Sequence, residues 1–257
     1  MRSQHSDAII LRHTPYGEAD LVVSFFTPGH GVLKGFARNA RRSRKRFGPA
    51  LELFAQTVMH WTERRRGELL ELKEAELVNL RSGLRGNLEA LAFAGYGVEV
   101  SEELAVAGGD QGAEYRLLKA YLDHLHLHGA SRAARLLLEL RLLQLSGTIP
   151  HLLHCAECYT VFREGEVAFE AARGGSLCSA CASRFPELSV HVTTLGSLSR
   201  CLQTRLELFE GFSLSAQTLD EGLRMTASAL APHFSRPLRS LAFLAEIEGG
   251  GDAGERL

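Results

Sequence analysis

The chain has 257 residues, of which 45% are hydrophobic and 23% are charged, and its formal net charge is −1. The composition is that of an ordinary globular protein and excludes a disordered, collagen-like or coiled-coil chain. Taken over the whole chain, the net charge argues against a nucleic-acid-binding protein. The charge is unevenly distributed, however, because residues 1–80 carry +4 and the remainder carries −5.

No run of 18 apolar residues occurs, and the most apolar stretch, residues 136–145, is interrupted by Glu139, Arg141 and Gln144. A membrane-spanning helix is therefore not expected. The N-terminus lacks the long apolar core and cleavage site of a signal peptide, so we expect a cytoplasmic protein. In that compartment the five cysteines are expected to be thiols or metal ligands rather than disulfides.

Residues 1–80 contain five short segments with the composition of β-strands, separated by turn signals. They are residues 8–11, 21–26, 32–38, 51–60 and 69–78. A five-stranded antiparallel meander of this length favours a small barrel of the OB type, because closure removes exposed sheet edges. Another small barrel or a two-sheet sandwich is the alternative, since periodicity does not fix the order of the strands. We expect residues 1–80 to be an OB-fold DNA-binding domain.

After residue 80 the apolar period becomes that of α-helices. Helices are predicted around residues 88–92, 117–125, 136–143, 195–209, 218–230 and 238–244. The third is apolar nearly all round, which predicts a buried central helix. Thr218 and Glu221 have the spacing of a capping box. We expect one all-α helical domain formed by residues 81–150 and 187–247, followed by a disordered polar tail at 248–257.

Four cysteines form two C-x-x-C pairs, Cys155 with Cys158 and Cys178 with Cys181, and 19 residues separate the pairs. This spacing predicts a four-thiolate zinc site, with redox dithiols or chance burial as alternatives. Four thiolates leave no position for water, so the zinc is expected to be structural. We therefore predict an inserted zinc module at residues 151–186 and an α+β fold class. Only His151 and His154 compete as ligands, whereas Cys201 is expected to be a buried apolar side chain.

Basic residues concentrate in two segments, and residues 34–66 carry a net +8. The predicted DNA-binding cations are Lys34, Arg38, Arg41, Arg42, Arg44, Lys45, Arg46, Arg64, Arg65 and Arg66. In an OB barrel, nucleic acid lies across strands 2 and 3 and between the 1–2 and 4–5 loops, where these two segments converge. Clustered like charges repel and favour an anionic partner, so we predict sequence-independent nucleic-acid binding. The alternative is a solvated edge that prevents strand pairing.

Aromatic residues accompany these cations, namely Tyr16, Phe36, Phe47 and Trp61. They could stack on bases, but we favour the barrel core for Phe36 and Trp61, because a small barrel must fill its interior. No phosphate-binding loop, nucleophile elbow or dinucleotide fingerprint is present, so no enzyme activity is expected.

Five segments, in order along the chain, together carry a resemblance to a known family. They are Ala8 to Leu11 with Tyr16 to Asp20, Gly35 to Arg38 with Arg41 to Ser43 and Phe47-Gly48, Leu51 to Phe54, Pro150 to Leu153 before the cysteines, and Arg236 to Ser240. This order resembles the bacterial RecO family of DNA-repair recombination mediators over essentially the whole chain.

The resemblance implies a non-enzymatic DNA-repair factor. Such a protein binds single- and double-stranded DNA, anneals complementary strands and, with RecR, helps load RecA onto strands covered by single-strand DNA-binding protein. It would associate with the nucleoid when bound to DNA. Residues 34–46 lie where the family places DNA-binding cations, whereas Arg64 to Arg66 depend on the OB argument alone. The alternatives are a zinc-stabilised protein-interaction adaptor and a thiol redox or metal enzyme.

Overall fold

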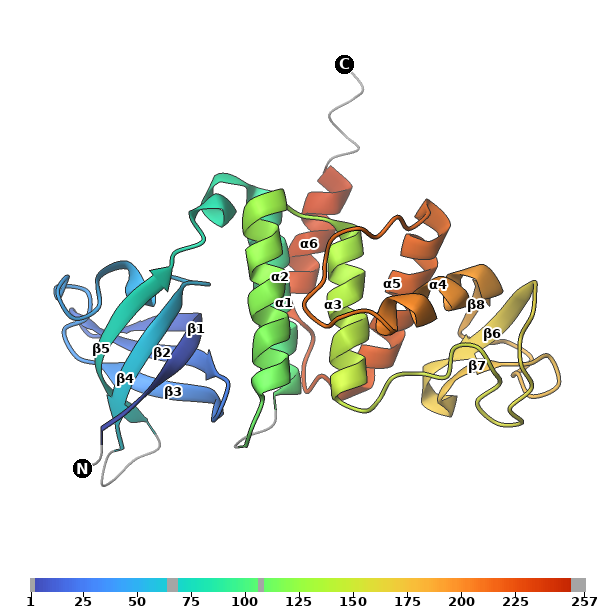
Figure 1. The fold of residues 1–257 in the computed structure, drawn as a ribbon, viewed down its shortest axis with the longest axis horizontal. Helices are drawn as coiled ribbons and strands as arrows, with labels where there is room; N and C mark the ends of the chain where they lie inside the picture. The colour runs from blue at the N-terminus through green and yellow to red at the C-terminus, as the bar shows by residue number, and fades with distance from the viewer. Residues whose placement is uncertain (1–2, 64–68, 106–108, 251–257) are drawn as a thin grey trace, which may run out of the picture. The chain divides into compact units, whose positions relative to one another are not determined.

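The structure is a computed structural model that describes residues 3–63, 69–105 and 109–250. The chain forms two compact units, one of residues 1–130 with 238–257 and the other of residues 131–237. The first unit contains a five-stranded barrel and three helices, and the second contains three helices and a small sheet (Figure 1).

The barrel is a closed ring of five strands, drawn blue to teal in Figure 1. The strands are β1 (Ser3–Tyr16), β2 (Asp20–Thr27), β3 (Gly31–Ala37), β4 (Gln56–Thr62) and β5 (Leu70–Asn79). Their order is β1-β2-β3-β5-β4, and β1 pairs with β4 to close the ring. The α+β class with an N-terminal OB-type barrel is thus confirmed. The simple antiparallel meander is wrong, because β3 pairs with β5 in parallel and not with β4.

Inward-facing apolar side chains fill the barrel, and the largest of them is Trp61. The glycine at position 35 allows β3 to approach β5 closely. A Cβ atom there would lie 2.4 Å from Leu72 Cδ2, which is shorter than any ordinary contact. The absence of a Cβ atom at Gly35 leaves room for Leu72 of β5 beside β3, where the two strands pair in parallel.

Residues 51–55, predicted as the first half of a strand, instead cap one end of the barrel. A single 3-10 turn, η1 (Gly48–Leu51), precedes them, and Phe54 has a positive φ of 66°. Ile10 exchanges backbone hydrogen bonds with this segment, donating to Ala55 and accepting from Phe54. Leu51, Phe54 and Ala55 are buried and Leu53 is exposed, so the burial does not follow the alternation that predicted an extended strand.

Three helices complete the first unit: α1 (Leu88–Leu104), α2 (Gly112–His128) and α6 (Arg239–Gly250). Glu99 of α1 accepts backbone hydrogen bonds from Arg239 and Ser240, so a carboxylate lies at the positive end of α6. Arg81 precedes a 3-10 turn, η2 (Ser82–Gly86), and is fully buried. It donates to Phe54 O at 2.5 Å and to Asp123 Oδ1 at 2.7 Å, and so joins the barrel end to α2.

The second unit is built on α3 (Arg132–Leu145), α4 (Val192–Leu202) and α5 (Ala216–Leu230). The prediction of a buried central helix is confirmed for α3, whose charged residues Arg135 and Glu139 pair with each other at 2.8 Å. Two other expectations are wrong. The helix predicted at 195–209 ends at Leu202, and Ser215, not Thr218, caps α5 by accepting from Thr218 N.

The excursion between α3 and α4 contains a three-stranded sheet that the sequence patterns did not indicate. Its strands are β6 (Glu166–Glu170), β7 (Gly175–Leu177) and β8 (Leu188–His191), and β6 lies in the middle. Single 3-10 turns follow β6 at Ala171–Arg173 and α5 at Ala231–His233. The helix α6 includes residues 248–250 of the predicted tail, and residues 251–257 lie outside the described part of the chain. No helix among the described residues is long and apolar enough to span a membrane.

Candidate nucleic-acid interface and metal centre

The predicted cations between residues 34 and 46 lie on β3 and on the loop that follows it. We call residues 38–47 the basic loop. Backbone hydrogen bonds fix this loop on two sides, from Arg41 N to Ala19 O at 3.0 Å and from Ala75 N to Arg46 O at 2.8 Å. Asn39 N donates to Asp20 Oδ1 at 2.6 Å. The loop is therefore held against both the β1–β2 turn and β5, with its side chains on a fixed backbone.

Among the residues that the structure describes, most of these cations have no anionic partner. Six of the seven side chains are exposed, and Arg46 is half-buried. Within the described residues, the one ion pair recorded for them joins Arg42 to Glu18 at 3.4 Å, between two exposed side chains. Arg41 donates to the carbonyl of Glu18 at 3.1 Å, which neutralises no charge. The basic loop therefore presents a positive potential to solvent.

Arg46 differs from the other cations because it holds the loop together. Its guanidinium donates to Arg38 O at 2.7 Å and to Ser43 Oγ at 3.2 Å. Its central carbon lies 5.0 Å from the ring centre of Phe47, and Phe47 is buried in the barrel core. We therefore assign Arg46 a positioning role. Arg64, Arg65 and Arg66, the other predicted cations, lie outside the described residues.

The aromatic residues divide between the core and the surface. Trp61 is 1% exposed and lies in the barrel core, as expected. The expectation that Phe36 fills the interior is wrong, because Leu33 and Ala37 take the inward positions of β3. Phe36 lies on the outer face with Lys34 and contacts Tyr16 edge-on, with ring centres 5.3 Å apart. Tyr16 is 61% exposed, so an aromatic surface lies beside the cations.

Part of the strand 2 surface predicted for nucleic acid is covered by helices. Ser24 Oγ donates to Glu102 of α1 at 3.2 Å. Further along β2, the ring of Phe26 packs edge-on against Tyr115 of α2, with ring centres 6.0 Å apart. These contacts occupy the outer face of β2 and leave the outer face of β3 and the basic loop as the candidate surface. Ser24 and Phe26 resemble ordinary strand residues, so the sequence carries no signal for this covering.

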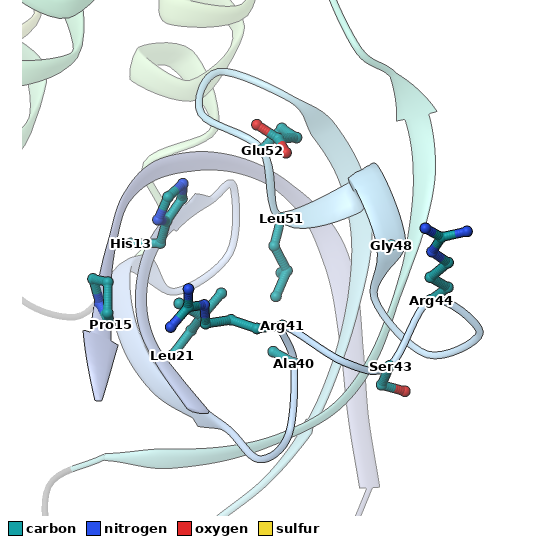
Figure 2. Close-up of a pocket in the computed structure, with 10 residues that line it drawn as sticks. All are labelled: His13, Pro15, Leu21, Ala40, Arg41, Ser43, Arg44, Gly48, Leu51 and Glu52. Carbon is teal, nitrogen blue, oxygen red and sulfur yellow. The ribbon is translucent and has the colours of Figure 1, made fainter. Parts of the chain in front are cut away.

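A pocket of about 500 Å³ opens beside the basic loop (Figure 2). We call it the loop pocket. Its walls combine apolar side chains from β1, β2 and η1 with polar side chains of the basic loop. Figure 2 shows Leu51 and Arg41 directed into the enclosed space and Arg44 directed away from it. The sequence gives no sign of this pocket, because its lining residues are distributed from residue 13 to residue 52.

The four predicted metal ligands come together in the second unit. Their Sγ atoms all lie within 4.8 Å of one another, and those of Cys158 and Cys178 are 3.6 Å apart. A tetrahedral ion with Zn–S bonds of about 2.3 Å would place sulfur atoms about 3.8 Å apart, so the cluster has the right size. The competing ligands His151 and His154 hydrogen-bond to each other at 2.7 Å and are not part of the cluster. Cys201 is buried, as expected.

The hydrogen bonds around the cluster lower the pKa of Cys155 and of Cys158, whereas hydrogen bonds with the thiols of Cys178 and Cys158 raise the pKa of Cys181. Burial would raise the pKa of Cys155, but backbone N–H groups of Cys158, Cys178 and Glu157 outweigh it and lower the pKa to about 6. Hydrogen bonds from the hydroxyl and backbone of Thr160 lower the pKa of Cys158. Metal binding requires thiolates, so these donors prepare the site for a cation.

An arginine connects the two C-x-x-C turns. Arg173 donates to Glu157, in the first turn, at 2.5 Å, and to the carbonyl of Cys181, in the second, at 2.7 Å. Within the turns, Tyr159 N donates to Cys155 O, and Cys181 N donates to Cys178 O, both at 3.0 Å. The sequence between the cysteines is therefore folded so that both pairs of thiols face one point.

Comparison with known proteins agrees with this architecture. The family model described as "Recombination protein O N terminal" matches residues 1–81, and the one described as "Recombination protein O C terminal" matches residues 85–242. The chain is 48% identical to the protein named DNA repair protein RecO of Syntrophotalea carbinolica over 250 residues, which cover 97% of both chains.

Other relatives carry the same name. The protein of Pelobacter propionicus is 36% identical over 251 residues, which cover 96% of this chain and 98% of its own. That of Geobacter metallireducens is 34% identical over 248 residues, which cover 96% and 99%. Both halves of the chain match, and the relatives are covered almost completely, so the chain belongs to the Recombination protein O (RecO) family.

Proposed function

We propose that this protein is a DNA-repair factor that binds single- and double-stranded DNA and anneals complementary strands. We further propose that it works with RecR to help load RecA onto single-stranded DNA covered by single-strand DNA-binding protein. The names of the relatives support a role in DNA repair. The proposed role depends on binding and requires no catalytic group.

The observation that carries this proposal is the basic loop together with Lys34 of the adjoining strand β3. Lys34, Arg38, Arg41, Arg42, Arg44 and Lys45 are exposed on one part of the barrel, and one carboxylate within the described residues pairs with them. Phosphates are the partners that such a surface attracts. Contacts to phosphates carry no sequence information, which suits a protein that must act on any sequence. Arg64 to Arg66 are included in the proposed surface on the strength of the barrel topology alone.

Strand annealing follows from the same surface. Two strands repel each other through their phosphates, and cations on the basic loop reduce that repulsion. The exposed ring of Tyr16 and the half-buried ring of Phe36 provide a platform on which unpaired bases can stack. Stacking leaves the pairing edges of the bases accessible to a second strand.

We assign a structural zinc ion to Cys155, Cys158, Cys178 and Cys181, the cluster whose size fits this metal. When bound, the ion would supply a cross-link between the two turns. Because all four ligand positions are thiolates, no position is left for a reacting water molecule. The contribution of the site is therefore to stability.

Charge reversal tests the proposal. The triple variant Arg41→Glu, Arg42→Glu, Arg44→Glu should lower the rate of annealing of complementary oligonucleotides by more than about tenfold, because it removes three contacts and adds three repulsions. A matched control changes the exposed Arg200, Arg205 and Arg224 of the second unit to Glu and alters the net charge equally. Circular dichroism verifies that both variants fold. Unchanged annealing in the first variant, or equal loss in both, would contradict the proposal.

A further inference from the structure

We propose that the loop pocket takes one unpaired nucleotide of the bound strand, with its base inside the pocket and the neighbouring phosphates on the cations at the rim. The inference rests on the proposed DNA binding and adds base insertion to it. Three observations carry it: the size and apolar walls of the pocket, the cations at its edge, and a buried histidine nitrogen without a hydrogen-bond partner among the described residues of its wall.

The size and the walls suit a nucleobase. The volume of about 500 Å³ lies within the range of ordinary small-molecule sites. Pro15, Leu21 and Leu51 contribute apolar surface to the walls. In a DNA strand, the flat faces of the bases are the apolar part, and they gain most from leaving water. A phosphate or a sugar alone would gain little from these side chains.

The cations lie where the backbone of such a nucleotide would pass. Arg41 points into the space, and its recorded hydrogen bond, to Glu18 O at 3.1 Å, uses one of its five N–H groups. A guanidinium in this position can stack on a base or bind its phosphate. Arg44 points away from the space and is exposed, so it suits the phosphate of the next nucleotide.

The opposite side of the pocket suits a base edge rather than a phosphate. His13 lies on this wall, and its Nδ1 atom is buried without a hydrogen-bond partner in the structure. A buried polar atom without a partner is unfavourable, and a base edge can supply the partner. Glu52 also lines the pocket (Figure 2); one of its carboxylate oxygens pairs with Arg85 at 3.4 Å, and the other can accept from an amino group of a base.

Base insertion requires an unpaired nucleotide. A base in a duplex must be unpaired and unstacked before it can enter, which is unfavourable. The loop pocket therefore favours single strands, whereas the exposed cations contact either form of DNA. This division gives the barrel a means of distinguishing the strand that is to be paired from the finished duplex.

The test uses the full chain and a mixed-sequence oligonucleotide with one 2-aminopurine between purines, where stacking quenches its fluorescence. Anisotropy of an end label measures DNA binding in the same samples. We expect a severalfold fluorescence increase when wild-type protein binds the single strand and none when it binds the duplex. Pro15→Phe should narrow the pocket and abolish the increase while the dissociation constant changes by less than about threefold. Thr14→Phe, at the neighbouring exposed position on the other face of β1, should keep the increase.

Failure of this inference can be separated from failure of the proposed function. If the protein binds the strand but fluorescence does not rise, or if it rises equally with the duplex, base insertion is wrong and DNA binding stands. An increase that persists in Pro15→Phe also overturns it. If wild-type protein binds neither form of DNA, both proposals are wrong. The comparison of single strand and duplex uses wild-type protein, so the test does not depend on the folding of a variant.

Discussion

The ion pair between Arg81 and Asp123 should contribute more to the stability of the first unit than a surface pair with the same N–O distance. Arg81 is fully buried, and the side chain of Asp123 is 27% exposed. The change Asp123→Asn preserves the shape of the side chain but leaves a buried guanidinium without its counter-charge. Removing one partner of a buried pair destabilises by about 3–5 kcal/mol, and the partial exposure of Asp123 favours the lower end of that range.

Lys119 provides an internal control, because it pairs with the same carboxylate. Its ammonium lies 2.7 Å from Asp123 Oδ2, the same distance as Arg81 Nε from Oδ1. The Lys119 side chain is 38% exposed, however, so solvent screens this pair. We expect Lys119→Gln to lower the free energy of unfolding by less than about 1 kcal/mol. If the N–O distance alone determined the contribution of each pair, Asp123→Asn and Lys119→Gln would destabilise the protein equally. The difference in burial predicts that Asp123→Asn destabilises it severalfold more.

The single tryptophan makes the measurement specific. Trp61 lies in the barrel core, so its fluorescence reports unfolding of the first unit. In a urea titration, Asp123→Asn should lower the midpoint with an unchanged slope. A loss of about 3 kcal/mol should also lower the melting temperature by roughly 6–12 °C for a unit of this size. A loss below about 1 kcal/mol, or an equal loss in Lys119→Gln, would refute the reasoning from burial.

The pH dependence of the same variant gives a second readout. Burial would raise the pKa of Asp123, but hydrogen bonds from Lys119 and Arg81 and the charge of Arg81 outweigh it and hold the pKa below its ordinary value. A lowered pKa in the folded state adds stability that is fully present above the ordinary value of about 3.9. This contribution is lost as the pH falls through the lowered value. The difference between wild type and Asp123→Asn should therefore shrink in acid.

Two further predictions concern the DNA surface and the metal. In a salt titration of single-strand binding, the double variant Arg44→Gln, Lys45→Gln should reduce the log–log slope by about 1.4, because each phosphate contact contributes about 0.7; an unchanged slope would remove these residues from the interface. Removal of zinc with a chelator, or Cys178→Ser, should lower the melting temperature of the second unit, followed by circular dichroism, while oligonucleotide affinity changes less than twofold. A large loss of affinity would instead give the metal a role in DNA contact.

Local patterns were sufficient for much of the fold. Alternation of apolar residues and glycine-containing turns indicated the barrel strands, and the spacing of the cysteines indicated the metal cluster, because both features depend on neighbouring residues. The alternation at residues 51–55 does not predict their structure, because a 3-10 turn and the positive φ of Phe54 bury Phe54 and leave Leu53 exposed. The small sheet was missed because its strands have three to five residues and depend on non-local contacts. For example, His151 exchanges backbone hydrogen bonds with Gly174 and Ser176 on either side of Gly175.

Local patterns also predicted only part of the candidate site. The cations of the basic loop could be predicted, because a dense charge run is visible in any sequence. The direction of Phe36 could not, since a shift of one residue along β3 exchanges the two faces of the strand. The covering of β2 by Glu102 and Tyr115 depends on how α1 and α2 pack against the barrel. The loop pocket forms where four separate segments come together, and the sequence of no single segment indicates it.

The exposed and buried arginines explain why net charge was a poor guide to function. Arg81 is buried against a carboxylate, and Arg141 is buried against the carbonyl of Leu208 and the ring of Phe209. Burial lowers the pKa of Arg141 to about 10, and its contacts are internal to the second unit. Such residues count toward the total charge but attract no phosphate. Cations that remain exposed and, among the described residues, mostly lack a carboxylate partner, as in the basic loop, create the external potential. The balance of ion pairs on each surface, rather than the sum over the chain, therefore indicates where DNA can bind.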